Sequence, residues 1–457
     1  MKNDQSRRAF LQTSAKLGLA GAAAPFVTTL AAIGEAAAAV STDYKAIVCL
    51  FMYGGNDQDN TVTPYDQASY NIYAGLRPAL AYQRASLDAT VLTPTTPLAG
   101  GRQYALAPAL APVLPLFDAG KLAVILNVGT LCEPTTKAQM KARSVALPPQ
   151  LGSHNDQQSY WQSTSPEGAV SGWGGRIGDL MQSGNGNSML TCINASGNAA
   201  FLSGKTAFSY SVSTKGPIQL TANTSLFGSA AGSSALKALM SGSHANMFEN
   251  EHAKVSKRSL DSGAQLTSSL AAAPAFTTVY PTENSLADQL KVVARMISVS
   301  SALGAKRQVF FVSMGGFDLH DSLAIQQPIL LDRVARAMRA FYDHTVELGV
   351  ADKVTTFTGS DFGRATVPNN DGSDHGWGGM HFVMGGAVKG KQFYGAAPEV
   401  GLRGPNDAGQ GSLLPNISVD QYASTLATWF GVSNGNMSTV LPNIDNYNES
   451  TWNLGFV

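Results

Sequence analysis

Four apolar segments of strand length constrain the fold of this chain more than any other feature. They are residues 44–53 (YKAIVCLFMY), 121–128 (KLAVILNV), 307–314 (RQVFFVSM) and 353–357 (KVTTF). A continuous apolar run is typical of a strand that is buried on both faces, as in a parallel sheet. Glycine directly follows the first three runs. We therefore expect these segments to be strands of one sheet.

Amphipathic helices separate the later strands. From Ser285 onward, apolar residues recur on one helical face, at Leu286, Leu290, Val293 and Ile297. Residues 329–348 repeat the pattern, and residues 419–430 predict a helix that packs against the sheet. Strands that alternate with helices favour an α/β fold with a doubly wound, mostly parallel sheet.

The domain organisation follows from composition. We expect one domain over residues 40–457, with an insertion at about 195–280 that is rich in Ser, Ala, Gly and Thr. This region is predicted to be partly helical around residues 233–257, and a long flexible linker is the alternative. The net charge is zero without a basic stripe, which argues against nucleic acid as a partner. The mature chain lacks an apolar run long enough to span a membrane.

The N-terminus has the pattern of an export signal. Residues 6–12 (SRRAFLQ) match the twin-arginine pattern, with Arg7 and Arg8 as the pair. A weakly apolar stretch follows at residues 17–33, and small residues at 36–39 offer a signal-peptidase site. We expect residues 1–38 to be a signal peptide and the mature protein to be periplasmic or secreted, in a bacterium.

The three cysteines, Cys49, Cys132 and Cys192, do not indicate a disulfide framework. Cys49 and Cys192 lie in apolar runs and are expected to be buried, while a bridge between Cys132 and Cys192 stays open. The sequence contains no CxxC motif, which argues against a structural zinc knuckle.

Aspartate and histidine gather just beyond the predicted strands. Because ligands bind beyond the carboxyl ends of strands in such sheets, these side chains are candidate metal ligands at one sheet edge. Carboxylate and imidazole together suit one or two divalent ions, with Zn, Mn, Fe, Mg and Ca unresolved. The candidates are Asp57, Asp318, His320, Asp361, Asp374, His375 and His381.

Two hydroxyls and one arginine are candidate catalytic groups. Ser153 lies in a loop with His154 and Asp156, and Thr130 ends the second strand. A hydroxyl beside a metal loses its proton more easily, so either could attack an ester. His154 and Asp156 could instead be ligands or orient the substrate, whereas a triad of sequence neighbours is disfavoured. Arg364 could clamp an anionic oxygen or pair with nearby acids.

Five motifs together resemble a known bacterial family, domain of unknown function 1501. They are GGNDQDNTVTPYD, SHNDQQSYWQS, GGFDLHD, SDFGR and SDHGWGGMHFVMGGAVKG, and the resemblance spans nearly the whole mature chain. It implies the fold of the alkaline phosphatase and sulfatase superfamily, in which two metals bind at the carboxyl edge of a doubly wound sheet.

The resemblance also implies individual roles. Asp57 resembles the aspartate of the second metal, whereas Asp318, His320 and His381 resemble ligands of the first. Asp361 resembles the aspartate of an Asp-His-Gly motif, with Phe362 where the histidine would be, and Asp374-His375 is a substitute source of that histidine. The Cys/Ser-x-Pro-x-Arg nucleophile motif of sulfatases is absent.

The combined expectation is an exported metal-dependent hydrolase of phosphate or sulfate esters. Its partner would be an anionic ester, either a small molecule or a polymer, and the oligomeric state is left open. The alternative is a non-catalytic periplasmic protein that assembles with others or binds a polymer while retaining the fold.

Overall fold

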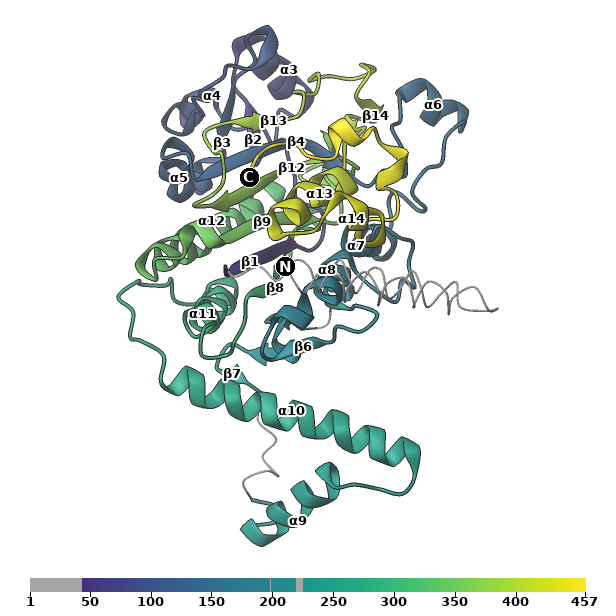
Figure 1. Cartoon of the computed structure of the whole chain (residues 1–457). Coiled ribbons are helices and arrows are strands. Elements are labelled where there is room, and N and C mark those ends of the chain that lie inside the picture. The colour runs from purple at the N-terminus through teal and green to yellow at the C-terminus, as the bar shows by residue number, and fades with distance from the viewer. Residues whose placement is uncertain (1–42, 198, 219–224) are drawn as a thin grey trace, which may run out of the picture. The chain divides into compact units, whose positions relative to one another are not determined.

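Strand β1 (Lys45–Met52) lies in the middle of the main sheet of this computed structural model, which describes residues 43–197, 199–218 and 225–457 (Figure 1). It pairs in parallel with β8 (Arg307–Met314) on one side and with β9 (Val354–Ser360) on the other. Both faces of all three strands are buried, as the apolar runs predict.

Among the described residues the main sheet has ten strands, in the order β13-β4-β12-β9-β1-β8-β5-β6-β7, with β16 beside β4. Parallel pairing dominates, and the fold is α/β as predicted. The other strands are β4 (Leu122–Gly129), β5 (Cys192–Asn194), β6 (Ser209–Ser213), β7 (Gly216–Pro217), β12 (Gly379–Gly385), β13 (Phe393–Tyr394) and β16 (Ile417–Ser418).

Strand β12 lies between β4 and β9 and runs antiparallel to both. The strands β4, β9 and β1 consequently share one direction, and their carboxyl ends meet at one edge. The sequence analysis did not predict β12, because glycines bound it and interrupt the apolar pattern.

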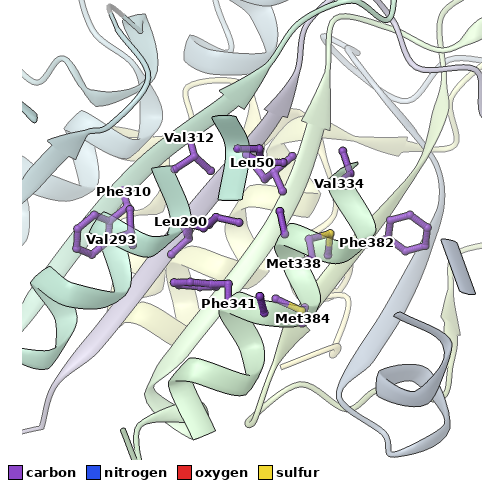
Figure 2. Packing of buried hydrophobic residues seen from close by; sticks show 14 of the residues in the cluster. Leu50, Leu290, Val293, Phe310, Val312, Val334, Met338, Phe341, Phe382 and Met384 are labelled. Atoms are coloured by element: carbon purple, nitrogen blue, oxygen red, sulfur yellow. The ribbon is translucent and has the colours of Figure 1, made fainter. Parts of the chain in front are cut away.

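Helices cover both faces of the sheet, which makes it doubly wound. Side chains alternate along β1, so that Leu50 faces one side and Cys49 the other. On the first side lie α11 (Ser285–Ser298) and α12 (Leu323–Glu347). Figure 2 shows Leu290 and Val293 of α11, and Val334, Met338 and Phe341 of α12, among the side chains of the sheet. On the second side lie α8 (Trp173–Met181), α13 (Val419–Phe430) and α14 (Asn434–Val440).

Smaller elements complete the structure. The short helices are α3 (Gln67–Leu76), α4 (Arg84–Leu87), α5 (Leu114–Asp118), α6 (Lys137–Ala142) and α7 (His154–Ser163). Within the part of the chain that the structure describes, three two-stranded sheets pair β2 (Val62–Pro64) with β3 (Tyr104–Leu106), β10 (Arg364–Pro368) with β11 (Ser373–His375), and β14 (Asp407–Gly409) with β15 (Ser412–Leu413).

The region predicted as an insertion is more structured than its composition indicates. Its first part supplies β6 and β7, which extend the main sheet, and its second part forms α9 (Ala230–Ser241) and α10 (Met247–Ala271). Residues 43–457 form one compact unit, whereas the predicted signal peptide lies outside the described residues.

Two further expectations concern the described part of the chain. None of its helices is long and apolar enough to cross a membrane. The three cysteines carry free thiols, so Cys132 and Cys192 are not bridged.

Candidate metal centre

Three histidines from separate segments point their Nε2 atoms at the carboxylate of Asp318. His154 opens helix α7, His320 follows β8, and His375 ends β11. The Nε2 atoms of His320 and His375 each lie 3.2 Å from Oδ1 of Asp318. The Nε2 atom of His154 lies 3.3 Å from Oδ2 of the same carboxylate.

The opposite nitrogen of the His154 and His375 rings faces an oxygen acceptor. Nδ1 of His154 lies 2.7 Å from Oδ2 of Asp361, and Nδ1 of His375 lies 2.7 Å from the carbonyl oxygen of Gly152. A backbone carbonyl can only accept, so His375 carries its proton on Nδ1 and a lone pair on Nε2. A carboxylate behind His154 favours the same tautomer. Nδ1 of His320 lies 3.3 Å from the amide nitrogen of Asn369 and 3.4 Å from Oδ1 of Asp374, so its partners include both a donor and an acceptor.

This arrangement fits a cation. Three Nε2 atoms, two of them with lone pairs set by their partners, converge on a carboxylate, and these groups repel one another unless a positive charge lies among them. The Nε2 atoms of His320 and His375 are 2.9 Å apart. Adjacent ligand atoms around tetrahedral zinc lie about 3.3 Å apart, given zinc–nitrogen bonds of about 2.0–2.1 Å. Ligand atoms of His154, Asp318 and His375 all lie within 4.8 Å of one another.

Arg364 binds the carboxylate of Asp318 and holds it in place. Its side chain is fully buried and donates to the carbonyl oxygens of Gly54, Gly55, Phe317 and Ser373 and to Oδ1 of Asp318. Burial alone would raise the pKa of Asp318, but the hydrogen bond and charge of Arg364, with His375 and His154, lower this pKa to about 2. Because protein acceptors occupy its guanidinium, Arg364 holds the site together and is not presented to a substrate.

The ring of Phe362 packs against the imidazoles of His154 and His375. Its ring centre lies 4.5 Å from that of His375 and 5.0 Å from that of His154, with interplanar angles of 34° and 37°. The resemblance implies that Asp374-His375 supplies the histidine that is missing at position 362, and the structure places the His375 ring directly against Phe362. Residues 362 and 375 therefore lie next to each other in the site.

Two glycines allow the loops of the site to approach closely. A Cβ atom on Gly372 would lie 2.1 Å from the backbone carbon of His320. A Cβ atom on Gly54 would lie 2.3 Å from the backbone nitrogen of Asp318, and Gly54 has a φ of +115°. Substitution at either position would displace a candidate ligand.

Asp361 lies behind His154 and is fully buried. Its Oδ2 also accepts a hydrogen bond from Nε2 of Gln158 at 2.8 Å, while its Oδ1 has no hydrogen-bond partner. His154 and Gln158 are four residues apart on α7, so one helix face delivers both to this carboxylate. The hydrogen bond to Asp361 raises the pKa of His154. Asp361 thus contacts the cluster through an imidazole.

The two candidate hydroxyls have different surroundings. Ser153 is the N-cap of α7 and accepts from the backbone nitrogen of Asp156 at 3.5 Å, in a partly exposed position directly before His154. Thr130 is buried, donates to Oε1 of Gln157 at 2.5 Å and accepts from Nε1 of Trp377 at 3.2 Å.

Asp57, predicted as a ligand, has other partners in the structure. Its carboxylate forms a buried ion pair with Arg77 and accepts from the backbone nitrogens of Asp59 and Asn60. Arg77 is itself fully buried, and such a charge needs a close counter-charge. The structure therefore gives Asp57 a role in tying α3 to the loop after β1.

His381, also predicted as a ligand, lies in the core. It is buried on β12, with Nδ1 3.3 Å from Oγ1 of Thr358 and its ring 4.7 Å from that of Trp161. Burial lowers the pKa of His381 to about 3, so the imidazole is neutral there. The structure brings Asp318, His320, Asp361, Asp374 and His375 together. Asp57 contacts Arg77 and His381 contacts Thr358 instead.

The site includes residues that the sequence analysis did not select as ligands. His154 was an open alternative, and Gln158 and Asn369 were not considered. Asn369 donates to Oδ1 of Asp374 at 2.7 Å. A usable signal for the first two was the segment from Ser153 to Gln158, where an N-cap serine precedes a histidine and a glutamine at i and i+4.

Comparisons with solved structures give distant similarities. Ps i-CgsB in complex with k-i-k-neocarrahexaose is 10% identical, over 88% of this chain and 77% of that chain, with a TM-score of 0.35. A Bacteroides thetaiotaomicron protein, described with the metabolism of multiple glycosaminoglycans, is 10% identical over 86% of this chain and 74% of its own, with a TM-score of 0.35. At this level the similarity assigns no role to a residue.

A search of curated proteins returned no match. The sequence does match a family model, that of a protein of unknown function (DUF1501), over residues 44–408. This range includes every residue of the candidate metal centre, and it covers most of the chain. The chain therefore belongs to the DUF1501 family.

Proposed function

We propose that this protein is an exported metal-dependent hydrolase of phosphate or sulfate esters. One observation carries the proposal: the Nε2 atoms of His154, His320 and His375 converge on the carboxylate of Asp318 at the carboxyl edge of a mostly parallel sheet. Ligand sites of α/β sheets occur at this edge.

The proposed centre takes one divalent ion, because one close group of at least three ligands is found among the described residues. His154, His375 and Asp318 would hold it, with His320 as a fourth ligand. Three imidazoles and a carboxylate favour Zn, Mn or Fe over Mg and Ca, which prefer all-oxygen sites. Such an ion supplies Lewis-acid polarisation of an ester oxygen and lowers the pKa of a nearby hydroxyl or water.

The residues around the cluster prepare it for this role. Gly152 and Asp361 hold protons on the Nδ1 atoms of His375 and His154, so that their Nε2 atoms stay free for the ion. Arg364 keeps Asp318 ionised. The side chains of Asp318 and His320 are 44% and 43% exposed, so an ester group can reach the cluster from solvent.

Ser153 is the side-chain hydroxyl best placed to take part in turnover, since it is partly exposed and adjoins His154. Thr130 is less suited, because its hydroxyl is buried and bonded on both sides. Export rests on the twin-arginine pattern at residues 6–12. Twin-arginine export carries folded proteins, so the cluster could be loaded before transport.

The hydrogen bonds of Arg364 to protein oxygens favour a second candidate function. A guanidinium that is bound on all sides by protein acceptors cannot clamp an anionic ester, and the sulfatase nucleophile motif is absent. The cluster would then hold a structural ion in a protein that binds a polymer or assembles with others.

Metal content and hydrolysis distinguish the two candidates. Purified protein should contain about one divalent ion per chain, and His375→Ala should lose most of it. The matched control is His252→Ala, which changes an exposed histidine on α10. Aryl phosphate and aryl sulfate esters test turnover by the loaded protein. Metal retention in His375→Ala overturns the metal centre, and a fully loaded wild type without turnover supports the second candidate.

A further inference from the structure

Helix α10 extends well beyond the part of the protein that it packs on. Its C-terminal half lies against the sheet domain, where Leu266 and Leu270 are buried and Gln265 accepts from Nδ2 of Asn187 at 2.8 Å. Its N-terminal half runs past β6 and β7, with α9 on the side away from the sheet (Figure 1). In that half only Ala253 is buried.

The face that is buried in the C-terminal half continues, uncovered, into the N-terminal half. Phe248, Val255, Ser262 and Leu266 are spaced by seven, seven and four residues and therefore share one helical face. Ser262 and Leu266 are buried, whereas Phe248 is 76% exposed and Val255 is 44% exposed. The amphipathic pattern thus predicts that another surface packs on Phe248 and Val255, and the described part of the chain does not provide one.

Two hollows flank this exposed face. One, of about 560 Å³, lies between α9 and α10 and is lined by Leu239, Met240, Phe248 and Ala253 together with His244 and His252. The other, of about 430 Å³, lies between β6 and α10 and includes Phe208, which is 57% exposed, and Val255. A helix of a second molecule could seat apolar side chains on both sides of α10.

The charges on α10 indicate what kind of partner fits. Its three acidic residues, Glu249, Glu251 and Asp261, equal its three basic residues in number, so the helix has no net charge. Helices that bind anionic lipid carry an excess of Lys and Arg on the polar face, which this helix lacks. Membrane binding is therefore disfavoured relative to a protein partner.

The order of these charges is self-complementary. Glu251 lies four residues before Val255 and Arg258 three residues after it, on the same side of the helix, where the two side chains lie 3.8 Å apart within one chain. An antiparallel partner would exchange this exposed pair for two pairs between the chains. When two copies of α10 cross antiparallel around a two-fold axis near Val255, Glu251 of each copy faces Arg258 of the other. A parallel crossing would instead set like charges against each other.

We propose that the exposed face of α10, flanked by Leu239 of α9, is a dimerisation surface that binds the same face of a second copy of this chain in antiparallel orientation. The contact is limited to a few helical turns, so we expect a concentration-dependent equilibrium between monomer and dimer. This inference is independent of the proposed hydrolase function.

Charge reversal tests the antiparallel geometry directly. Glu251→Arg alone and Arg258→Glu alone should each be monomeric, because like charges then meet twice in the dimer. An equimolar mixture of these two variants should form a heterodimer, since opposite charges meet at both contacts. The double variant should recover the wild-type dimer. Sedimentation velocity across a concentration series measures each species.

The apolar part of the surface is tested by Phe248→Asp, which should abolish dimerisation. Val170→Asp is the matched control, because Val170 is a 90% exposed apolar residue elsewhere on the chain. Thermal unfolding checks that each variant folds. A wild type that is monomeric at every concentration overturns the proposal, as does dimerisation unchanged by Phe248→Asp. Sedimentation of wild type, but not Phe248→Asp, with anionic vesicles in place of dimers would also overturn it.

Discussion

Replacing Asp361 with asparagine tests whether the metal centre is oriented from behind by a buried carboxylate. Asparagine keeps the shape of the side chain and one acceptor for Nδ1 of His154 and Nε2 of Gln158, which lie 2.7 Å and 2.8 Å from Asp361. What it removes is the negative charge, and with it the added basicity of the His154 imidazole.

The expected loss of metal affinity is tenfold to a hundredfold. Removal of a carboxylate that orients a ligating histidine has an effect of about this size, equivalent to about 1.4–2.7 kcal/mol. Asp361 is fully buried, and charge interactions are stronger away from water, so the upper end of the range is expected. If Asp361 were itself a ligand, the loss would be far larger than a hundredfold.

The assay is competition for the metal between the protein and a chromogenic chelator, with total metal measured by mass spectrometry. Asp343→Asn is the matched control, because Asp343 pairs with Arg339 on the solvent side of α12. Thermal unfolding of the metal-free variants checks that both fold. An Asp361→Asn protein that binds metal as tightly as wild type would refute the reasoning from the Nδ1 partners.

Three further predictions concern other parts of the chain. Replacing Arg7 and Arg8 with lysine should leave unprocessed precursor in the cytoplasm, as fractionation and immunoblotting would show; a normal periplasmic yield would contradict this. Asp57→Asn should lower the free energy of unfolding by about 3 kcal/mol in urea titration, because buried Arg77 keeps only Asp59, at 3.4 Å. Metal content should be unchanged in that variant, and loss of metal would restore Asp57 as a ligand. Burial raises the pKa of Asp420 to about 7, so the folded state binds its proton more tightly than the unfolded state. Between about pH 4 and pH 7 this group therefore lowers stability as the pH rises, by on the order of a few kcal/mol. Asp420→Asn should remove that part of the slope, and identical pH profiles for variant and wild type would contradict the prediction.

Much of the fold was predictable because burial on both faces leaves a plain signal. The runs at residues 44–53 and 307–314 correspond closely to β1 and β8, and the pattern from Ser285 corresponds to α11. Strand β12 was missed because Gly379 and Gly385 bound it, and its antiparallel pairing has no local signature. In the predicted insertion, short β6 alternates buried and exposed residues in a sequence of serines, which resembles a loop.

The candidate site was predictable at the level of the sheet edge but not of the individual side chain. Strand order predicts which loops meet, and Asp318, His320 and His375 do meet. The direction of each side chain depends on distant partners. The sequence around Asp57 does not indicate that Arg77 binds its carboxylate, and the sequence around His381 does not indicate that Trp161 packs against its ring.

The charge of the site links the ion to the proposed substrate. With the histidines in the neutral form that binds a metal, the formal charges of Asp318, Asp361 and Asp374 are −1 each and that of Arg364 is +1, a sum of −2. This charge repels an anionic ester, although solvent at the half-exposed Asp374 weakens its share. A divalent ion brings the sum to zero. Under the proposed function, binding of the ion and of the anionic ester are therefore coupled, and each must tighten the other by the same factor. The buried Arg364 cannot replace the ion in this role, because its donors already face protein oxygens.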